Sequence, residues 1–241
     1  MRRQKIRNTL LLFSMLLFPV TLNYFSPYLI VQGSFAGIVS GSALFFLALF
    51  LFSLFFGRAY CGWICPAGAV QDCCVHINNK AVGRKQKLIK YFIWVPWLTS
   101  VIAGFISAGG IKEFNPVFLT DYGVSASSLH GCIIYVFVVI FIAVISLNFG
   151  KRSFCHSVCW MAPFMVLGSK IKNRLGYPSL HVKIDSSSCV NCKKCDSNCP
   201  MSIQVSKIVS SNKKRIDNVE CILCGKCEEV CPKKSLKLTL R

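Results

Sequence analysis

The sequence predicts an all-α membrane bundle of four transmembrane helices, built as a duplicated helical hairpin, with a small α+β module at the C-terminal end. Two observations predict this architecture. Of the 241 residues, 54% are hydrophobic and only 15% are charged, a composition too apolar for a soluble domain of this length. In addition, eight of the 15 cysteines lie between Cys189 and Cys231. We therefore divide the chain into a membrane domain, residues 1–175, and a cytoplasmic module, residues 176–241.

Uncharged stretches mark the four predicted crossings. No Asp, Glu, Lys or Arg occurs from Asn8 to Gly57, and because a bilayer core needs about 20 apolar residues per helix, this stretch holds two. A cleaved signal peptide is the alternative for the first, but no small-residue cleavage site follows the apolar run. The expected crossings are Thr9–Ile30, Phe35–Phe56, Tyr91–Ile111 and Leu129–Phe149.

The positions of the basic residues predict the orientation, because cytoplasmic loops carry an excess of Lys and Arg. The opposite loops carry only Lys112. We therefore expect a multi-pass protein of the cell inner (cytoplasmic) membrane with both termini in the cytoplasm and its basic flanks against anionic membrane lipid. The basic flanking residues are Arg2, Arg3, Lys5, Arg7, Arg58, Lys80, Arg84, Lys85, Lys87, Lys90, Lys151 and Arg152.

Two cysteine runs dominate the C-terminal module. Both read C-x2-C-x2-C-x3-C-P, the bacterial pattern for [4Fe–4S] ligation, in which the fourth cysteine crosses to the other cluster. The pattern predicts a two-cluster ferredoxin module. A zinc site is the alternative, but zinc usually takes four ligands in two pairs, and a disulfide scaffold is disfavoured on the reducing side of the membrane. One predicted cluster is held by Cys189, Cys192, Cys195 and Cys231, the other by Cys221, Cys224, Cys227 and Cys199.

The formal net charge of +19 does not indicate a nucleic-acid partner. Much of the charge is the flank bias that sets orientation. Each oxidised [4Fe–4S] cluster with four thiolates also contributes about −2.

Two further cysteine pairs form an internal repeat. Cys61 and Cys65 follow the second predicted helix, and Cys155 and Cys159 follow the fourth; both segments read Phe-Gly-basic and then aromatic-Cys-x3-Cys. Two hairpins in the same orientation, related by an axis along the membrane normal, would bring the pairs together. Thiols at i and i+4 share one face of a helical turn. We expect a shared redox or metal site; four buried packing cysteines are the alternative.

Other residues near these pairs are assigned more modest roles. His156 lies between Cys155 and Cys159 and is the candidate catalytic side chain, whereas His76 is expected to be a solvated surface residue. Cys73, Cys74 and Cys132 are expected to be packing residues. The tryptophans fit an interfacial belt or bundle packing.

Three connecting segments have predicted structures as well. The segment 67–79 is expected to form an amphipathic surface helix, and 176–188 a short polar linker. The segment 206–215 is expected to be a solvated turn or hairpin, or a docking face for an acidic redox partner.

Taken together, the four helices, Cys61–Pro66, the second Cys-x3-Cys and the two-cluster module resemble the NapH-type polyferredoxins, with related proteins of nitrous oxide reduction and methylamine utilisation. Where that family has proline after the second pair, this chain has Trp160. The resemblance implies a quinol dehydrogenase subunit that passes electrons between the quinone pool and a partner redox protein, with quinone as a further ligand. The alternative is a maturation factor that supplies electrons for metal or cofactor insertion into another enzyme. No phosphate-binding loop or hydrolytic triad competes with these readings.

Overall fold

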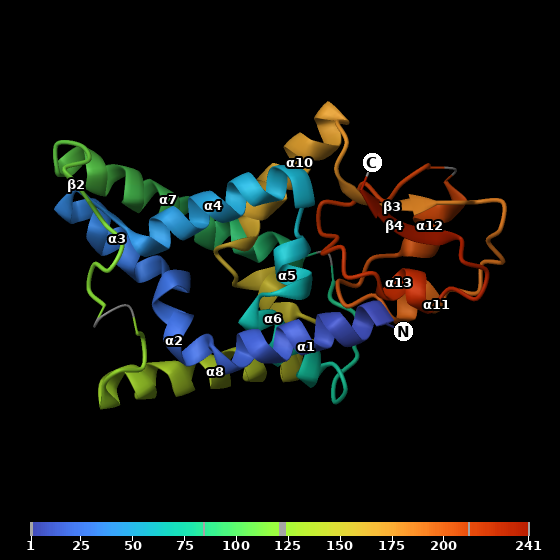
Figure 1. Cartoon of the computed structure of the whole chain (residues 1–241), viewed down its shortest axis with the longest axis horizontal. Helices are drawn as coiled ribbons and strands as arrows, with labels where there is room; N and C mark the ends of the chain where they lie inside the picture. Colours follow the sequence, from blue (N-terminus) through green and yellow to red (C-terminus); the bar gives the residue numbers. More distant parts are fainter. Residues whose placement is uncertain (1, 84, 121–123, 212, 241) are drawn as a thin grey trace.

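The helices run side by side along the long axis of the molecule, and the cysteine-rich module lies beyond one end of them (Figure 1). The computed structural model describes residues 2–83, 85–120, 124–211 and 213–240, so Arg84, one of the basic flanking residues, lies outside the described residues. Both chain termini are found at the module end in Figure 1. Two helices are long and apolar enough to cross a membrane, α7 (Gln86–Ser107) and α8 (Leu129–Phe149).

The first predicted crossing is wrong as a single helix. The chain instead forms α1 (Arg2–Leu16), α2 (Phe18–Thr21) and the 3-10 turn η1 (Leu22–Phe25), with a bend of 57° after α1. Pro19 lies in the first turn of α2 and lacks the N–H that would continue the helix. Pro27 then opens α3 (Pro27–Ala36), whose first turn is capped by the Ser26 hydroxyl.

The second crossing, Phe35–Phe56, is shorter than expected. Gly37 ends α3 in the left-handed conformation with φ 72°, and β1 (Ile38–Ser40) then pairs in parallel with β2 (Glu113–Asn115). Ser40 caps α4 (Gly41–Phe56), which therefore has 16 residues. The third crossing begins five residues early and ends at Ser107, and the fourth matches α8 at both bounds. Counting the bent pair as one span, the described residues contain up to three candidate spans.

The internal repeat appears as two series of elements in the same order. Gly57 follows α4 and precedes α5 (Ala59–Trp63) and α6 (Pro66–Cys74); Gly150 follows α8 and precedes α9 (Ser153–Ser157) and α10 (Ala162–Leu175). Both glycines have positive φ, 55° and 101°, a backbone conformation that glycine adopts at little cost. The two series exchange partners, because α10 packs on α4 while α6 packs on α8.

The cysteine-rich module is built on a two-stranded antiparallel sheet. β3 (Leu180–Ile184) pairs with β4 (Leu236–Leu240), with Val182 opposite Leu238. The module adds α11 (Lys194–Ser197), α12 (Val205–Ser210) and α13 (Lys226–Glu229). The predicted polar linker 176–188 is therefore wrong, because it contains β3, which buries Val182 and Ile184. The solvated turn predicted at 206–215 is also wrong over its first half, where α12 buries Val209 against the module core.

The structure corrects the expectation for the segment 67–79 and decides between the two alternatives for the tryptophans. The segment 67–79 is not a surface helix: α6 ends at Cys74 and is buried along most of its length, because it lies between α1 and α8. The sequence predicts that the tryptophans form an interfacial belt or pack in the bundle, and Trp63, Trp97 and Trp160 do pack against the core. The indole N–H groups of Trp63, Trp97 and Trp160 donate to the carbonyls of Leu223, Pro27 and Phe25.

Candidate functional site

The two cysteine runs of the module line two separate cavities. Each cavity receives three cysteines from one run and the fourth cysteine of the other run, which is the pattern of crossed ligation. One cavity is lined by Cys189, Cys192, Cys195 and Cys231, and is called here the outer cavity. The second is lined by Cys199, Cys221, Cys224 and Cys227, and is called the inner cavity.

The loops around the two cavities repeat the same left-handed backbone positions. Asn191 and Leu223 precede the second cysteine of their runs, with φ 51° for both. Ser202 and Lys234, three residues after the fourth cysteine, have φ 51° and 52°. Non-glycine residues rarely adopt this conformation, so its repetition at matching places indicates two loops held in one required shape.

The inner cavity is enclosed and apolar. Apart from its cysteines, no ionisable side chain lines it among the residues the structure describes. Burial raises the pKa of Cys221 to about 12 and that of Cys199 above its usual range. Without a metal these thiols stay protonated at neutral pH, whereas a coordinating metal deprotonates a thiol outright. The donor set suits a metal cluster and is costly to leave ionised without one.

The four membrane-domain cysteines are buried together where the two series of the repeat meet. Cys61 lies in α5 and Cys65 just after it, and Cys155 lies in α9 with Cys159 just after it; all four are at most 5% exposed. They lie close enough for the negative charge of the other three to raise the pKa of Cys65, which burial raises most. The arrangement brings the two predicted pairs to one place.

The surroundings of these cysteines follow the repeat. The Gln71 amide donates to Cys155 Sγ at 3.0 Å, and Met165 Sδ lies 3.5 Å from Cys61 Sγ. Gln71 follows Cys61 by as many residues as Met165 follows Cys155, so equivalent positions touch the thiol of the opposite series. The sequence analysis missed both residues, and their equal spacing from the cysteines was the available signal.

Two buried arginines and a buried histidine lie around the four thiols. Arg58, Arg152 and His156 are fully buried. Arg58 Nε and Nη2, Arg152 Nη2 and both ring nitrogens of His156 have no hydrogen-bond partner within the described part of the chain. Burial lowers the pKa of His156 to about 3, so its ring is neutral. Buried donors without partners are costly, and here several gather around thiols that would carry negative charge as metal ligands.

Two carboxylates form ion pairs with these arginines. Asp72 accepts from Arg152 Nε at 2.7 Å and also pairs with Arg7. Glu220 pairs with Arg58 and accepts from Lys90 Nζ at 2.5 Å. Glu220 belongs to the module, so this pair joins the module to the membrane domain. The importance of Glu220 was not predictable from sequence, because its partners are distant in the chain.

The inner cavity lies directly against the first cysteine pair. A side chain at Gly62 would overlap the carbonyl oxygen of Ile222, so only glycine lets the two loops meet so closely. The amide of Gln4 donates to the carbonyl of Cys224 at 2.7 Å, and Arg7 donates to that of Gly62 at 2.7 Å. The N-terminal helix α1 therefore clamps both loops.

An apolar cavity adjoins the same cysteines on the side of the helix bend. It has a volume of about 160 Å³ and lies between η1, α8 and the loop before α10. Its lining includes Cys65, Cys159 and Trp160 as well as Phe18 and Ile142.

The remaining predicted residues lie apart from this site. His76 is exposed, as expected, and Cys74 is buried. Cys73 and Cys132 are exposed, so their interpretation as packing residues is wrong: Cys73 lies on the outer side of α6, and Cys132 lies in the first turn of α8, outside the bundle. No three His, Cys, Asp or Glu side chains of the described residues are close enough to hold a single metal ion.

Comparisons with known proteins agree with this arrangement. A family model described as a 4Fe-4S binding domain matches residues 41–85 and again residues 131–178, and a 4Fe-4S dicluster domain matches residues 181–232. The two matches to the first model each contain one of the Cys-x3-Cys pairs. No solved structure matches the chain significantly.

Several curated proteins are similar to the chain. The methylamine utilization ferredoxin-type protein MauN of Methylorubrum extorquens is 30% identical over 72% of this chain and 59% of its own length. The putative electron transport protein YccM of Escherichia coli is 23% identical over 76% and 52%, and the ferredoxin-type protein NapH of Haemophilus influenzae is 26% identical over 59% and 47%. The chain spans about half to two thirds of the length of the curated relatives it matches. Together with the two family models and the duplicated cysteine pairs, these similarities identify the chain as a member of the NapH-type polyferredoxin family of iron-sulfur electron-transfer proteins.

Proposed function

We propose that this iron-sulfur protein passes electrons between the quinone pool of a membrane and a partner redox protein. The observation that carries the proposal is the contact between three sites: the inner cavity, the four membrane-domain cysteines and the apolar cavity. The inner cavity touches the first cysteine pair through Gly62 and Ile222, and the apolar cavity shares Cys65 and Cys159 with the four-cysteine cluster.

Two [4Fe–4S] clusters fit the module. Cys189, Cys192, Cys195 and Cys231 would hold one in the outer cavity, and Cys199, Cys221, Cys224 and Cys227 the other in the inner cavity. Such clusters, when bound, supply reversible one-electron transfer. The protein contributes the thiols, and its Ile203 N–H donates to Cys199 Sγ at 3.5 Å, a contact of the kind that tunes cluster potential.

A third metal or iron-sulfur centre fits Cys61, Cys65, Cys155 and Cys159. The unpartnered donors of Arg58, Arg152 and His156 favour an anionic group, such as a cluster with four thiolates, at this place. Four packing cysteines would leave these donors without any compensation. His156 is therefore assigned a role beside the centre, where its ring nitrogens are free to donate or accept a hydrogen bond.

Quinone is the ligand proposed for the apolar cavity. An apolar cavity of about 150 Å³ in a protein accommodates a benzene ring, and this one has about 160 Å³, which suits a single quinone ring. Its opening among the helices gives access from the hydrocarbon layer, where quinones dissolve.

The membrane arrangement completes the proposal. Four crossings, with the bent α1–η1 segment and the short α4 as two of them, place both termini and the module in the cytoplasm. Basic residues such as Lys80 and Lys85 are exposed at the module end of the helices, where anionic lipid would attract them.

Metal analysis tests the centres separately. The proposal expects about eight irons per chain from the module, and about twelve if the third centre is also a [4Fe–4S] cluster. Changing Cys61, Cys65, Cys155 and Cys159 to alanine together should remove only the metal of the third centre and stop quinol oxidation. The Cys73→Ala/Cys74→Ala variant is the matched control and should lose no metal. Unchanged metal content and quinol oxidation in the fourfold variant would leave packing as the role of these residues.

Crossed ligation has its own test. Cys199→Ser should damage the cluster that Cys221, Cys224 and Cys227 also hold, although Cys199 lies nearest in sequence to Cys195. Electron paramagnetic resonance of the reduced protein distinguishes the two clusters, and loss of the outer-cavity signal instead would contradict the assignment.

A further inference from the structure

The two cavities of the module differ in their exposure and charge. Cys192 is exposed, and beside it Val190 is 58% exposed. Pro232 is exposed on the other side of the same cavity. Three lysines, Lys193, Lys194 and Lys233, line the outer cavity, and Lys234 is exposed directly after them. No lysine or arginine of the described residues lines the inner cavity.

We propose that the rim of the outer cavity is the docking surface for a small acidic electron-carrier protein. The surface consists of an apolar centre, Val190, Cys192 and Pro232, and a basic rim, Lys193, Lys194, Lys233 and Lys234. The inference rests on the proposed function in one respect, because it takes the outer cavity to hold a cluster. A docked carrier exchanges one electron with that cluster: one of the two is oxidised by one electron and the other is reduced.

The pattern matches a transient protein interface. Such interfaces have a small apolar core and a charged rim, and complementary charge accelerates encounter. The four lysines point to a partner with an acidic surface. Two carboxylates lie nearby, and both are already engaged: Asp185 accepts from Ser187 and Ser188, and Asp196 accepts from the backbone N–H and hydroxyl of Ser206. Both carboxylates stay charged, but their oxygens are held by donors within the module, and the four lysines outnumber them at the rim.

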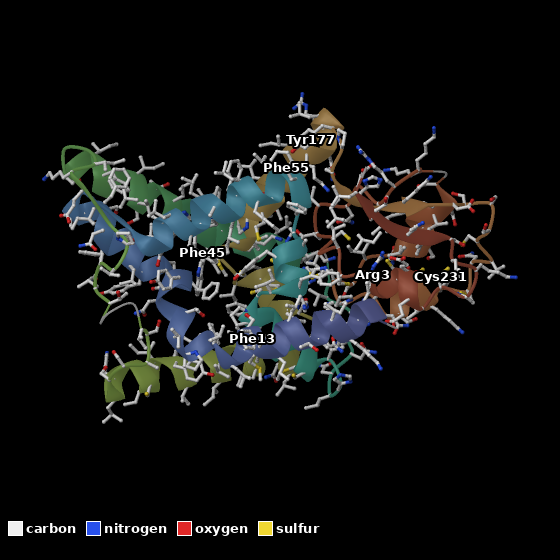
Figure 2. All side chains as sticks on the ribbon, viewed as in Figure 1. Arg3, Phe13, Phe45, Phe55, Tyr177 and Cys231 are labelled. Atoms are coloured by element: carbon white, nitrogen blue, oxygen red, sulfur yellow. The ribbon has the colours of Figure 1, made fainter. Side chains whose placement is uncertain are left out.

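Position distinguishes a protein partner from a lipid surface. The module meets the helices beside the inner cavity, by the contacts of Gln4 and Trp63 with Cys224 and Leu223. It also meets the membrane domain at Ser197 and Ser202, which accept from Lys151 and from the backbone N–H of Val82. In Figure 2, Cys231 of the outer cavity lies beyond Arg3, which is near the module end of α1. None of these contacts involves Val190, Cys192 or Pro232, which leaves the centre of the surface open to a soluble protein. Lys193, on the rim, also lines a cavity that the module forms with Lys87 and Lys151.

Charge reversal of the rim provides the test. The full-length protein with its clusters, in nanodiscs of phosphatidylcholine, is measured against a plant-type [2Fe–2S] ferredoxin, which is acidic. The variant K193E/K194E/K233E/K234E should lower the association rate constant about tenfold or more at low ionic strength, with little change in the dissociation rate constant. High salt should remove the difference, because it screens surface charge.

A matched variant controls for net charge. K183E/K213E/K214E/K237E reverses four exposed lysines of the same module that do not line the outer cavity, and should change the association rate constant less than threefold. Equal effects of the two variants would overturn the proposal, as would a rim variant that binds the ferredoxin normally but fails to bind phosphatidylglycerol vesicles. Iron content measured on the same samples separates this outcome from failure of the proposed function, because a chain without the outer cluster would lack its iron whatever the rim does.

Discussion

At the scale of single residues, Asp72 is the most connected carboxylate of the membrane domain. It lies between Arg7 of α1 and Arg152, the residue before α9. Burial raises the pKa of Asp72, but the two guanidinium groups outweigh burial and hold it well below the usual range. One side chain of α6 therefore ties together three segments that are far apart in sequence.

Asp72→Asn should destabilise the protein by about 3–5 kcal/mol, since removing one partner leaves two buried guanidinium groups unpaired. Thermal unfolding in detergent, followed by circular dichroism, measures the loss. Glu113→Gln, at an exposed carboxylate of β2, is the control and should change stability by less than about 0.5 kcal/mol. A loss of similar size in both variants would contradict the special role of Asp72.

Lowering the pH should remove the stabilisation that the Asp72 carboxylate provides. Because the pKa of Asp72 is lowered in the folded protein from an ordinary value of 3.8, its stabilisation is complete above about pH 4 and decreases as the pH falls through the lower, folded-state value. The stability difference between the wild type and Asp72→Asn should be constant from neutral pH to about pH 5 and shrink in stronger acid. A difference that instead shrinks on raising the pH would have the wrong sign for a lowered carboxyl pKa.

Sequence reasoning located the cysteines well and their partners poorly. The twelve cysteines proposed as ligands stand in spaced motifs, and spacing is visible in a sequence. Glu220 acts through contacts across the fold, so no local pattern marks it, and Gln71 and Met165 are marked only by their equal spacing from Cys61 and Cys155. Their burial and pairing depend on how α6, α10 and the second cysteine run come together in space.

At the scale of elements, proline and glycine explain where the helix predictions succeeded. The α8 prediction is right at both ends because the segment is apolar throughout, begins after the capping Ser128 and ends at Gly150. The first crossing is divided into shorter helices because Pro19 and Pro27 interrupt the backbone hydrogen bonds, which hydropathy alone does not measure. A kink at Pro19 is expected from the sequence, and the chain bends by 57° there. The module strands were missed because β3 is short and alternates within a polar stretch.

The crossing of α4 and α10 depends on a glycine. A side chain at Gly168 would overlap Ser53 of α4, and small residues of this kind let membrane helices approach closely. Gly168→Val should cost about 1–3 kcal/mol through overpacking, measured by thermal unfolding in detergent. Gly83→Ala is the control, because a side chain there meets nothing within 4 Å; a neutral Gly168→Val would show that the two helices separate without cost.

At the scale of the whole molecule, the contact between Gly62 and Ile222 decides how the two domains cooperate. Gly62→Val should push the second cysteine run away from the first cysteine pair. We expect both clusters of the module to be retained, electron transfer from quinol to slow by at least tenfold, and limited proteolysis between the domains to accelerate. Normal transfer with accelerated proteolysis would separate the contact from the electron path.

Membrane topology is testable with single labels. Lys112→Cys places a thiol in the turn beside β2, and Lys85→Cys places one just before α7, at the module end of the helices; both positions are exposed. With the exposed Cys73 and Cys132 first changed to serine, a membrane-impermeant maleimide added to intact cells should label the first and not the second. Labelling of the second alone would invert the proposed orientation.

The exchange of partners between the two series also governs the order in which the chain can fold. α6 packs on both α1 and α8, and the face that packs on α8 has no partner until Phe149 is synthesised, about 75 residues after Cys74. At about 5–20 residues per second, the newly made first half waits about 4–15 s with that face uncovered. During that interval the exposed face of α6 must be covered by the insertion machinery or by a chaperone. Variants that slow translation between the two halves should therefore expose the chain to proteolysis before it binds iron.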